Sequence, residues 1–161
     1  MAVDMFLNID TIKGETTDKV HSKTTDMDLL SWSWGVSNSG TAHVGGGAGA
    51  GKANFQDISV TKYVDSASHA LLGACATGEH FAKAKLTVRK AGKTQLEYII
   101  IELEEVLITS VSTGGSGGED RLTENVSLNF AKIKFSYTPQ KADGTLGDVL
   151  PFTYDIAGNS I

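Results

Sequence analysis

Residues 112–137 read STGGSGGEDRLTENVSLNFAKIKFSY and join a glycine-rich loop to the longest alternating segment of the chain. Within it, apolar side chains recur at every second position, first on even and then on odd numbers: Val126, Leu128, Phe130, Ile133, Phe135 and Tyr137. This period of two predicts a half-buried strand rather than a helix. One extra residue near Ala131 and Lys132 changes the phase, which indicates a bulge, a bend between two sheets, or two short strands separated by a kink.

The same alternation predicts further strands on both sides of this stretch: 5–9, 30–36, 58–60, 86–88, 96–111 and 152–156. In the segment 96–111 the continuous apolar run Tyr98 to Ile101 indicates that both faces are covered there. Glu102, Glu104 and Glu105 are compatible with a helix instead, but the β-branched content favours a strand.

One segment has a helical composition. Asp65 to Ser68 supply an Asp or Ser N-cap, and Gly78 supplies a C-cap, so we expect one short α-helix over about residues 66–77. Leu71, Leu72 and Cys75 are expected to share its buried face.

Length and composition limit the class of protein. The 161 residues predict a single domain, 1–161, that is mainly β: a β-barrel of two antiparallel sheets with one short helix and long Gly-rich loops. A lone cysteine, Cys75, forms no internal disulfide. A formal net charge of −5 with dispersed basic residues argues against nucleic-acid binding, and no apolar run is long enough for membrane insertion. The N-terminus, MAVDMFLNID, does not have the pattern of a signal peptide.

Motifs for catalysis or cofactor binding are weak. The segment 46–52, GGAGAGK, matches the spacing of a P-loop, but Ala53 replaces the hydroxyl that ligates magnesium and a strand pattern follows instead of a helix. Cys75 with His80 is an incomplete metal-binding pair. The glutamates at 102–105 are more simply a solvated strand edge than a general acid and base. We therefore expect no enzyme, no cofactor and no metal site.

The 18 glycines concentrate in two places, 40–51 and 114–118. Ordering the seven residues 112–118 in an isolated subunit costs on the order of 10 kcal/mol, with almost no side chain to offset it. Charged residues at 119–121 follow directly, where a neighbouring subunit could pair with them. The loop is therefore either a subunit contact or a plain flexible hairpin tip.

Four blocks of the chain are similar to one known family: KVHSKTTDMDLLSWSWGVSNSG at 19–40, AHVGGGAGAGKANFQDISVTKYVD at 42–65, AKLTVRKAG at 84–92, and STGGSGGEDRLTENVSLNFAKIKFSYTPQKADG at 112–144. They resemble the Hcp family, the haemolysin-coregulated proteins of type VI secretion systems. The resemblance covers nearly the whole chain, whereas the last ten residues, FTYDIAGNSI, lack the tryptophan expected near that end.

The resemblance implies a β-barrel subunit that forms six-membered rings, which stack into a tube propelled out of a bacterium by a contractile sheath with a spike at its tip. It also implies that the ring lumen holds and protects small effector proteins. Partners would be further copies of the chain, the spike and sheath proteins, and effectors. The protein would reside in the bacterial cytoplasm before firing and be secreted afterwards. Because the chain stops at Ile161, we expect the plain tube subunit without a fused toxin domain.

Three sets of site residues follow from the resemblance combined with the patterns. Ser31 and Ser33, which alternate with two tryptophans, are the candidates for effector contact in the lumen. The ring-stacking loop would consist of Val44, Gly45, Gly46, Gly47, Gly49, Gly51 and Lys52. The subunit contact would consist of Gly114, Gly115, Gly117, Gly118, Glu119, Asp120 and Arg121.

Two other functions compete with this interpretation. A phage tail tube subunit has the same physics as a secretion tube subunit. A stand-alone β-sandwich that binds a carbohydrate or peptide is a competing class, and exposed aromatic residues on its loops would distinguish it.

Overall fold

The computed structural model describes residues 3–40, 52–92 and 94–161. The elements in this part of the chain are, in order, β1 (Val3–Ile9), the 3-10 helix η1 (His21–Thr24), β2 (Met27–Asp28), β3 (Ser31–Ser33), β4 (Val36–Asn38), β5 (Ala53–Phe55), β6 (Ile58–Tyr63), α1 (Ser68–Thr77), β7 (His80–Lys90), β8 (Glu97–Thr113), β9 (Thr123–Tyr137) and β10 (Leu150–Asp155). Neither described helix is long and apolar enough to span a bilayer.

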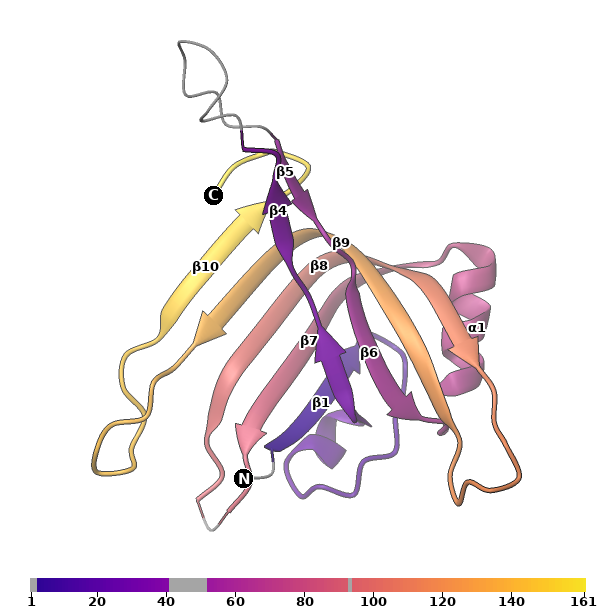
Figure 1. Ribbon diagram of the computed structural model, residues 1–161. Coiled ribbons are helices and arrows are strands. Elements are labelled where there is room, and N and C mark those ends of the chain that lie inside the picture. Colours follow the sequence, from indigo (N-terminus) through magenta and orange to yellow (C-terminus); the bar gives the residue numbers. More distant parts are fainter. Residues whose placement is uncertain (1–2, 41–51, 93) are drawn as a thin grey trace.

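The strands form two antiparallel sheets. The larger has eight strands in the order β2-β1-β7-β8-β9-β6-β3, with β10 also paired to β9, and the smaller contains β4 and β5. The large sheet curls into a half barrel, with β10 at one side of the molecule and α1 at the other (Figure 1). This arrangement confirms the predicted mainly β fold with two sheets and one α-helix.

Strand β9 changes partners along its length. It pairs with β8 throughout, with β6 over its first half and with β10 over its second half. It is one continuous strand of 15 residues, so the interpretation as two separate short strands is wrong. A bend accounts for the change of phase, but it lies within the one large sheet and not, as predicted, between two sheets.

That bend extends across three neighbouring strands. In each strand two buried residues stand three apart instead of two: Phe81 and Ala84, Leu103 and Val106, Phe130 and Ile133. The residues skipped between the corresponding strand pairs are Ala82, Glu105 and Ala131, which we call the crease. Glu105 has a left-handed backbone with φ 55°. The crease is therefore a continuous line at which the sheet changes direction.

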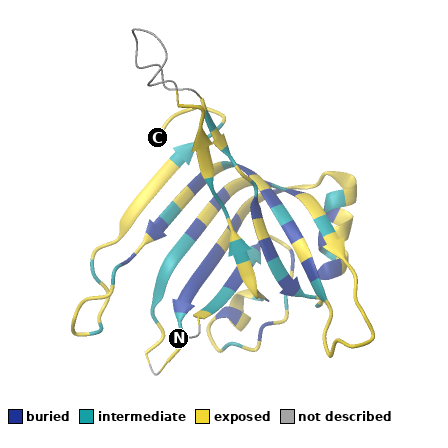
Figure 2. Cartoon of the chain, in the orientation of Figure 1, coloured by how far each residue is buried: buried dark blue, intermediate teal, exposed yellow. Residues whose placement is uncertain are grey.

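The buried residues of the strands form one core on the inner side of the curled sheet, visible as dark segments in Figure 2. The expected strand at 30–36 divides into β3, which pairs with β6, and β4, which pairs with β5. It divides around Trp34 and Gly35, where Gly35 accepts a hydrogen bond from the Gln56 N–H at 2.9 Å. Trp32 and Trp34 are half-buried against the core.

Helix α1 begins two residues later than expected, although Gly78 ends it in the left-handed conformation, with φ 72°. The residue before the helix is Ala67, whose N–H donates to the Asp65 carboxylate at 2.9 Å, so Asp65 caps the helix from two residues further back. Leu71 is buried but Leu72 is exposed, which corrects the expectation that both share the buried face. Adjacent residues of a helix differ by about 100° in direction, so they cannot point the same way.

A buried ion pair attaches the start of α1 to the sheet. The Lys62 ammonium donates to Glu124 at 2.5 Å and to Asp65 at 2.8 Å, and the Ser68 hydroxyl donates to the same Glu124 oxygen at 2.7 Å. Lys62 and Glu124 are almost completely buried. Removing one partner of such a pair costs about 3–5 kcal/mol, so the pair holds the start of α1 firmly to β6 and β9.

Candidate functional site

The two serines predicted to face the lumen lie on a broad polar surface. Ser31 and Ser33 are exposed on β3, on the opposite side from Trp32. The strand register places them in two rows across β3, β6, β9 and β8: Ser31, Thr61, Asn125 and Ser112, then Ser33, Ser59, Ser127 and Ser110. We call these eight residues the hydroxyl face.

Side-chain hydrogen bonds connect neighbouring strands across this face. The Thr61 hydroxyl donates to Asn125 Oδ1 at 2.7 Å, and the Ser59 and Ser127 hydroxyls are 3.4 Å apart. At its end, Asp57 accepts hydrogen bonds from Thr109 and Asn129 at 2.7 and 2.9 Å. The bonds hold the polar groups in fixed rows along the sheet.

A bulge in β8 sets the second row. The register with β9 shifts between Ile108 and Ser110, so that Thr109 is the extra residue. The Thr109 hydroxyl also donates to the Ser127 carbonyl at 3.2 Å. The bulge thereby brings Ser110 opposite Ser127 and keeps the row continuous.

The hydroxyl face contains no charged residue, because the charged residues of its strands either face the core or lie at or beyond the crease. Lys62 and Glu124 are buried on the core side, where they pair with each other. Hydroxyl and amide groups both donate and accept hydrogen bonds, so they adapt to many polar surfaces. Such a surface suits contact with varied partners better than catalysis, which needs a nucleophile beside a base.

The predicted subunit-contact residues lie in the exposed hairpin loop between β8 and β9: Gly114, Gly115, Gly117, Gly118, Glu119, Asp120 and Arg121. The Arg121 guanidinium lies 3.9 Å from the centre of the Tyr63 ring. A Cβ atom at Gly115 would overlap the side chain of Leu122, so this glycine permits a close approach within the loop. Ser112 leads into the loop, which therefore adjoins the hydroxyl face.

Of the predicted stacking loop, Lys52 is described and exposed, directly before β5. Val44, Gly45, Gly46, Gly47, Gly49 and Gly51 lie outside the described residues.

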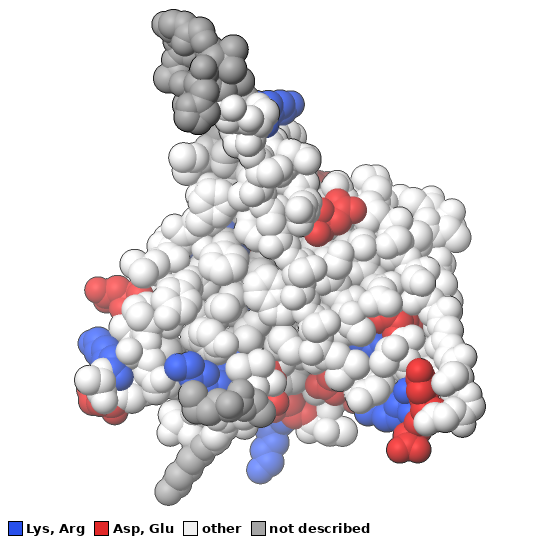
Figure 3. All heavy atoms as spheres, viewed as in Figure 1, with Lys and Arg blue, Asp and Glu red and all other residues white. Residues whose placement is uncertain are grey.

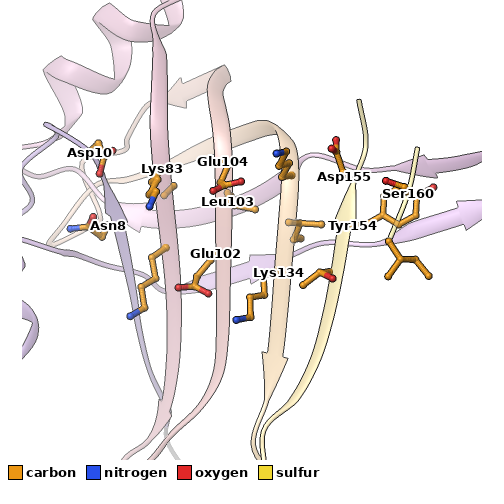
Figure 4. A pocket seen from close by; sticks show the side chains of 16 residues that line it. Asn8, Asp10, Lys83, Glu102, Leu103, Glu104, Lys134, Tyr154, Asp155 and Ser160 are labelled. Atoms are coloured by element: carbon orange, nitrogen blue, oxygen red, sulfur yellow. The ribbon is translucent and has the colours of Figure 1, made fainter. Parts of the chain in front are cut away.

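A second polar surface lies beyond the crease, on the same side of the sheet as the hydroxyl face. Two rows of alternating charge cross β7, β8 and β9: Lys85, Glu102 and Lys134, then Lys83, Glu104 and Lys132. They line a pocket of about 640 Å³, which also includes Asn8, Asp10, Asp155 and Ser160 (Figure 4). Each glutamate is flanked by two lysines, an arrangement of opposite charges that stabilises a sheet by about 0.2–1 kcal/mol per pair.

The sequence identified two members of the hydroxyl face and missed six. Thr61, Asn125, Ser127 and their neighbours are visible as the polar half of each alternation. What the sequence lacks is the order β3-β6-β9-β8, which brings together residues almost a hundred positions apart. Within the described residues, no group of three or more His, Cys, Asp or Glu side chains is placed to hold a metal ion.

Comparison with known proteins identifies the family to which this fold belongs. A family model described as type VI secretion system effector, Hcp, matches residues 6–137. The protein hcp1 of Pseudomonas aeruginosa is 61% identical over 145 residues, which cover 89% of this chain and 88% of that protein. The chain belongs to the Hcp family. Hcp proteins are structural proteins of the type VI secretion tube and not enzymes, and membership implies that the chain associates with itself.

Solved structures of Hcp proteins agree with the fold described above. Hcp1 from Salmonella typhimurium superimposes with a TM-score of 0.81 at 34% identity, covering 99% of both chains. Another solved structure, of a type six secretion system protein, has a TM-score of 0.91 at 28% identity, again covering 99% of both chains. The half barrel with its single α-helix is thus the Hcp fold.

Proposed function

We propose that this chain forms six-membered rings that stack into the type VI secretion tube, with the hydroxyl face lining the lumen and holding small effector proteins. The observation that carries the proposal is the uncharged hydroxyl face, which spans four neighbouring strands opposite the core. A wall of fixed charges would bind partners of one sign and repel those of the other, whereas hydroxyl and amide groups allow weak contacts with different effectors.

The ring and the tube require two kinds of contact between copies. Within a ring, a head-to-tail interface uses two different surfaces of each subunit. Between rings, the segment Val44 to Lys52 makes the stacking contact, and residues Gly114 to Arg121 take part in the subunit contact. The assembled tube resides in the bacterial cytoplasm, engages the spike and sheath proteins, and is secreted with its effectors when the sheath contracts.

The mass of the native protein tests the assembly. At micromolar concentration we expect a species six times the mass of the chain, and negative-stain images that show a central hole. A stand-alone binding module remains a monomer in the same measurement. The type VI matches favour the secretion tube over a phage tail tube, which would give the same mass.

Replacing Ser33 by glutamine tests the lumen assignment. Ser33 lies at the β3 end of the second row, and a longer side chain there narrows the space for cargo beside the sheet. We therefore expect Ser33→Gln to keep its ring mass but to co-purify with several-fold less small effector protein. Ser22→Gln is the matched control, because Ser22 is exposed on η1 away from this face. Equal amounts of effector with both variants, measured by mass spectrometry, would show that Ser33 does not face the cargo.

A further inference from the structure

The core-facing side of the sheet is left partly uncovered near β10. Leu150 pairs across from Tyr137, and Phe152 pairs across from Phe135, so these side chains share the inner side of the sheet. Yet Leu150 is 58% exposed, Tyr137 41% and Phe152 39%. We call Ile99, Phe135, Tyr137, Leu150 and Phe152 the open face.

The open face is apolar and aromatic, and it lacks charge. Ile99, which pairs with Tyr137, and Phe135 are half-buried and continue it toward the core. In Figure 3 the atoms over β10 and the end of β9 are white across the middle, with charged atoms at the rim. Depletion of charge with enrichment of aromatic residues is the composition of the buried centre of a protein interface.

The opposite side of the molecule carries a second uncharged surface, on α1. Its outward residues His69, Leu72, Gly73 and Ala76 recur at a spacing of three to four, so they form one face of the helix. Leu72 is 43% exposed, and no Asp, Glu, Lys or Arg occurs from Ser66 to Thr77. Glycine and alanine on this helix face allow another surface to approach closely.

We infer that α1 of one subunit docks on the open face of the next copy of the chain, with Leu72 inserted among Tyr137, Leu150 and Phe152. The inference rests on the proposed ring and identifies the surfaces that close it. The two surfaces match because both lack charge, and one offers aromatic side chains where the other offers small residues and a single leucine.

Their placement also suits a ring. Strand β10 and helix α1 lie at opposite sides of the half barrel (Figure 1), so one copy presents its helix where the next presents its open face. A contact between two different patches propagates around a ring, whereas a contact of one patch with itself stops at a dimer. The buried attachment of α1 through Lys62 and Glu124 keeps the helix in a fixed position for docking.

Cross-linking between separately prepared variants tests the contact. Leu72→Cys chains and Phe152→Cys chains, each in a Cys75→Ala background, are mixed, allowed to assemble, and then treated with a short bismaleimide. We expect covalent dimers from this mixture. A double variant with both cysteines in one chain should give a ladder of up to six cross-linked chains. Leu72→Cys with Val3→Cys is the control, since Val3 is exposed on β1, which β7 and β8 separate from β9 and its partner β10. Phe152→Cys cross-linking to itself, or equal yields from the control pair, would overturn the inference.

Lysine substitutions give an independent measurement. Leu72→Lys and Phe152→Lys each place a charge in the centre of the contact, so the chain concentration at which half of the rings form should rise at least tenfold. Val3→Lys should leave that concentration unchanged. Circular dichroism of each variant checks the fold. A ring that survives both lysines overturns this inference alone, and an unmodified chain that stays monomeric overturns the proposed function as well.

Discussion

At the scale of single residues, Arg89 organises the end of the sheet where β1 and β7 pair. Its side chain is almost fully buried, and the guanidinium bonds to Asp18 and, at 3.3 Å, to Asp4. It also lies 4.8 Å from the centre of the Phe6 ring, which stacks on His21 at 4.0 Å. The hydrogen bond from Arg89 holds the pKa of Asp18 well below its ordinary value. Through this cluster the polar segment before β2 is fastened to the sheet.

Asp18→Asn should make the free energy of unfolding depend less on pH in the acid range. A carboxyl whose pKa is depressed by folding stabilises the protein above its unfolded pKa of about 3.9, and that contribution is lost as the pH falls through the folded pKa. We therefore expect the natural chain to lose stability below about pH 4. The variant should be less stable by about 2 kcal/mol at pH 7 and show a flatter profile in urea titrations between pH 2 and 7.

Asp143→Asn is the control for this profile. Hydrogen bonds from Thr145 also lower the pKa of Asp143, but the group is fully exposed, so its replacement should change stability little. If the two variants have the same acid profile, the buried Arg89 cluster is not what determines the acid sensitivity.

At the scale of elements, the crease shows how three strands serve two parts of one sheet. Glu104 and Glu105 are both exposed and adjacent in β8, but Glu105 alone of the two has a positive φ. A left-handed backbone costs a residue with a Cβ atom about 1–2 kcal/mol, and β-branched residues tolerate it least.

Glu105→Val should therefore destabilise the fold by about 1–2 kcal/mol, whereas Glu105→Gly, which removes the Cβ atom from the left-handed position, should destabilise it less. Chemical denaturation of the two variants measures the difference. Equal losses with both variants would mean that the conformation of Glu105 is not strained.

The sequence predicted these elements better than their arrangement. Alternation identified the buried residues of β9, such as Val126 and Phe130, because a sheet with one wet face repeats every two residues. It also joined β3 to β4, since the change of partner at Trp34 depends on β5 and β6. It missed the burial of Lys62 and Glu124, because each charge is acceptable inside only beside the other. The hydroxyl face could not be predicted for a similar reason, because its members come together only through the pairing of strands that are distant in the sequence.

At the scale of the whole molecule, the half barrel divides its outer side into a neutral and a charged part. The crease separates the hydroxyl face from the rows of lysine and glutamate around the pocket in Figure 4. The open face and the outer side of α1 occupy two further sides. Each surface thus has its own chemistry, as expected of a subunit with several distinct neighbours.

Deleting Gly45 to Gly49 separates the two levels of assembly. The ring contacts proposed above lie on other elements, so we expect the shortened chain to keep the ring mass in native mass spectrometry. Negative-stain images should show single rings without tubes, because the stacking segment is lost. Tubes of normal length from the shortened chain would remove the stacking role from this segment.

The sharing of β8 and β9 by both halves of the sheet restricts how such a chain can evolve. An inserted residue between the crease and the hairpin that no bulge absorbed would turn over every side chain beyond it, carrying serines and asparagines into the core and valines and leucines out into the solvent. A change of length within these two strands therefore needs a bulge such as the one at Thr109 to keep the two faces of the sheet apart, whereas the loops can change length without this consequence.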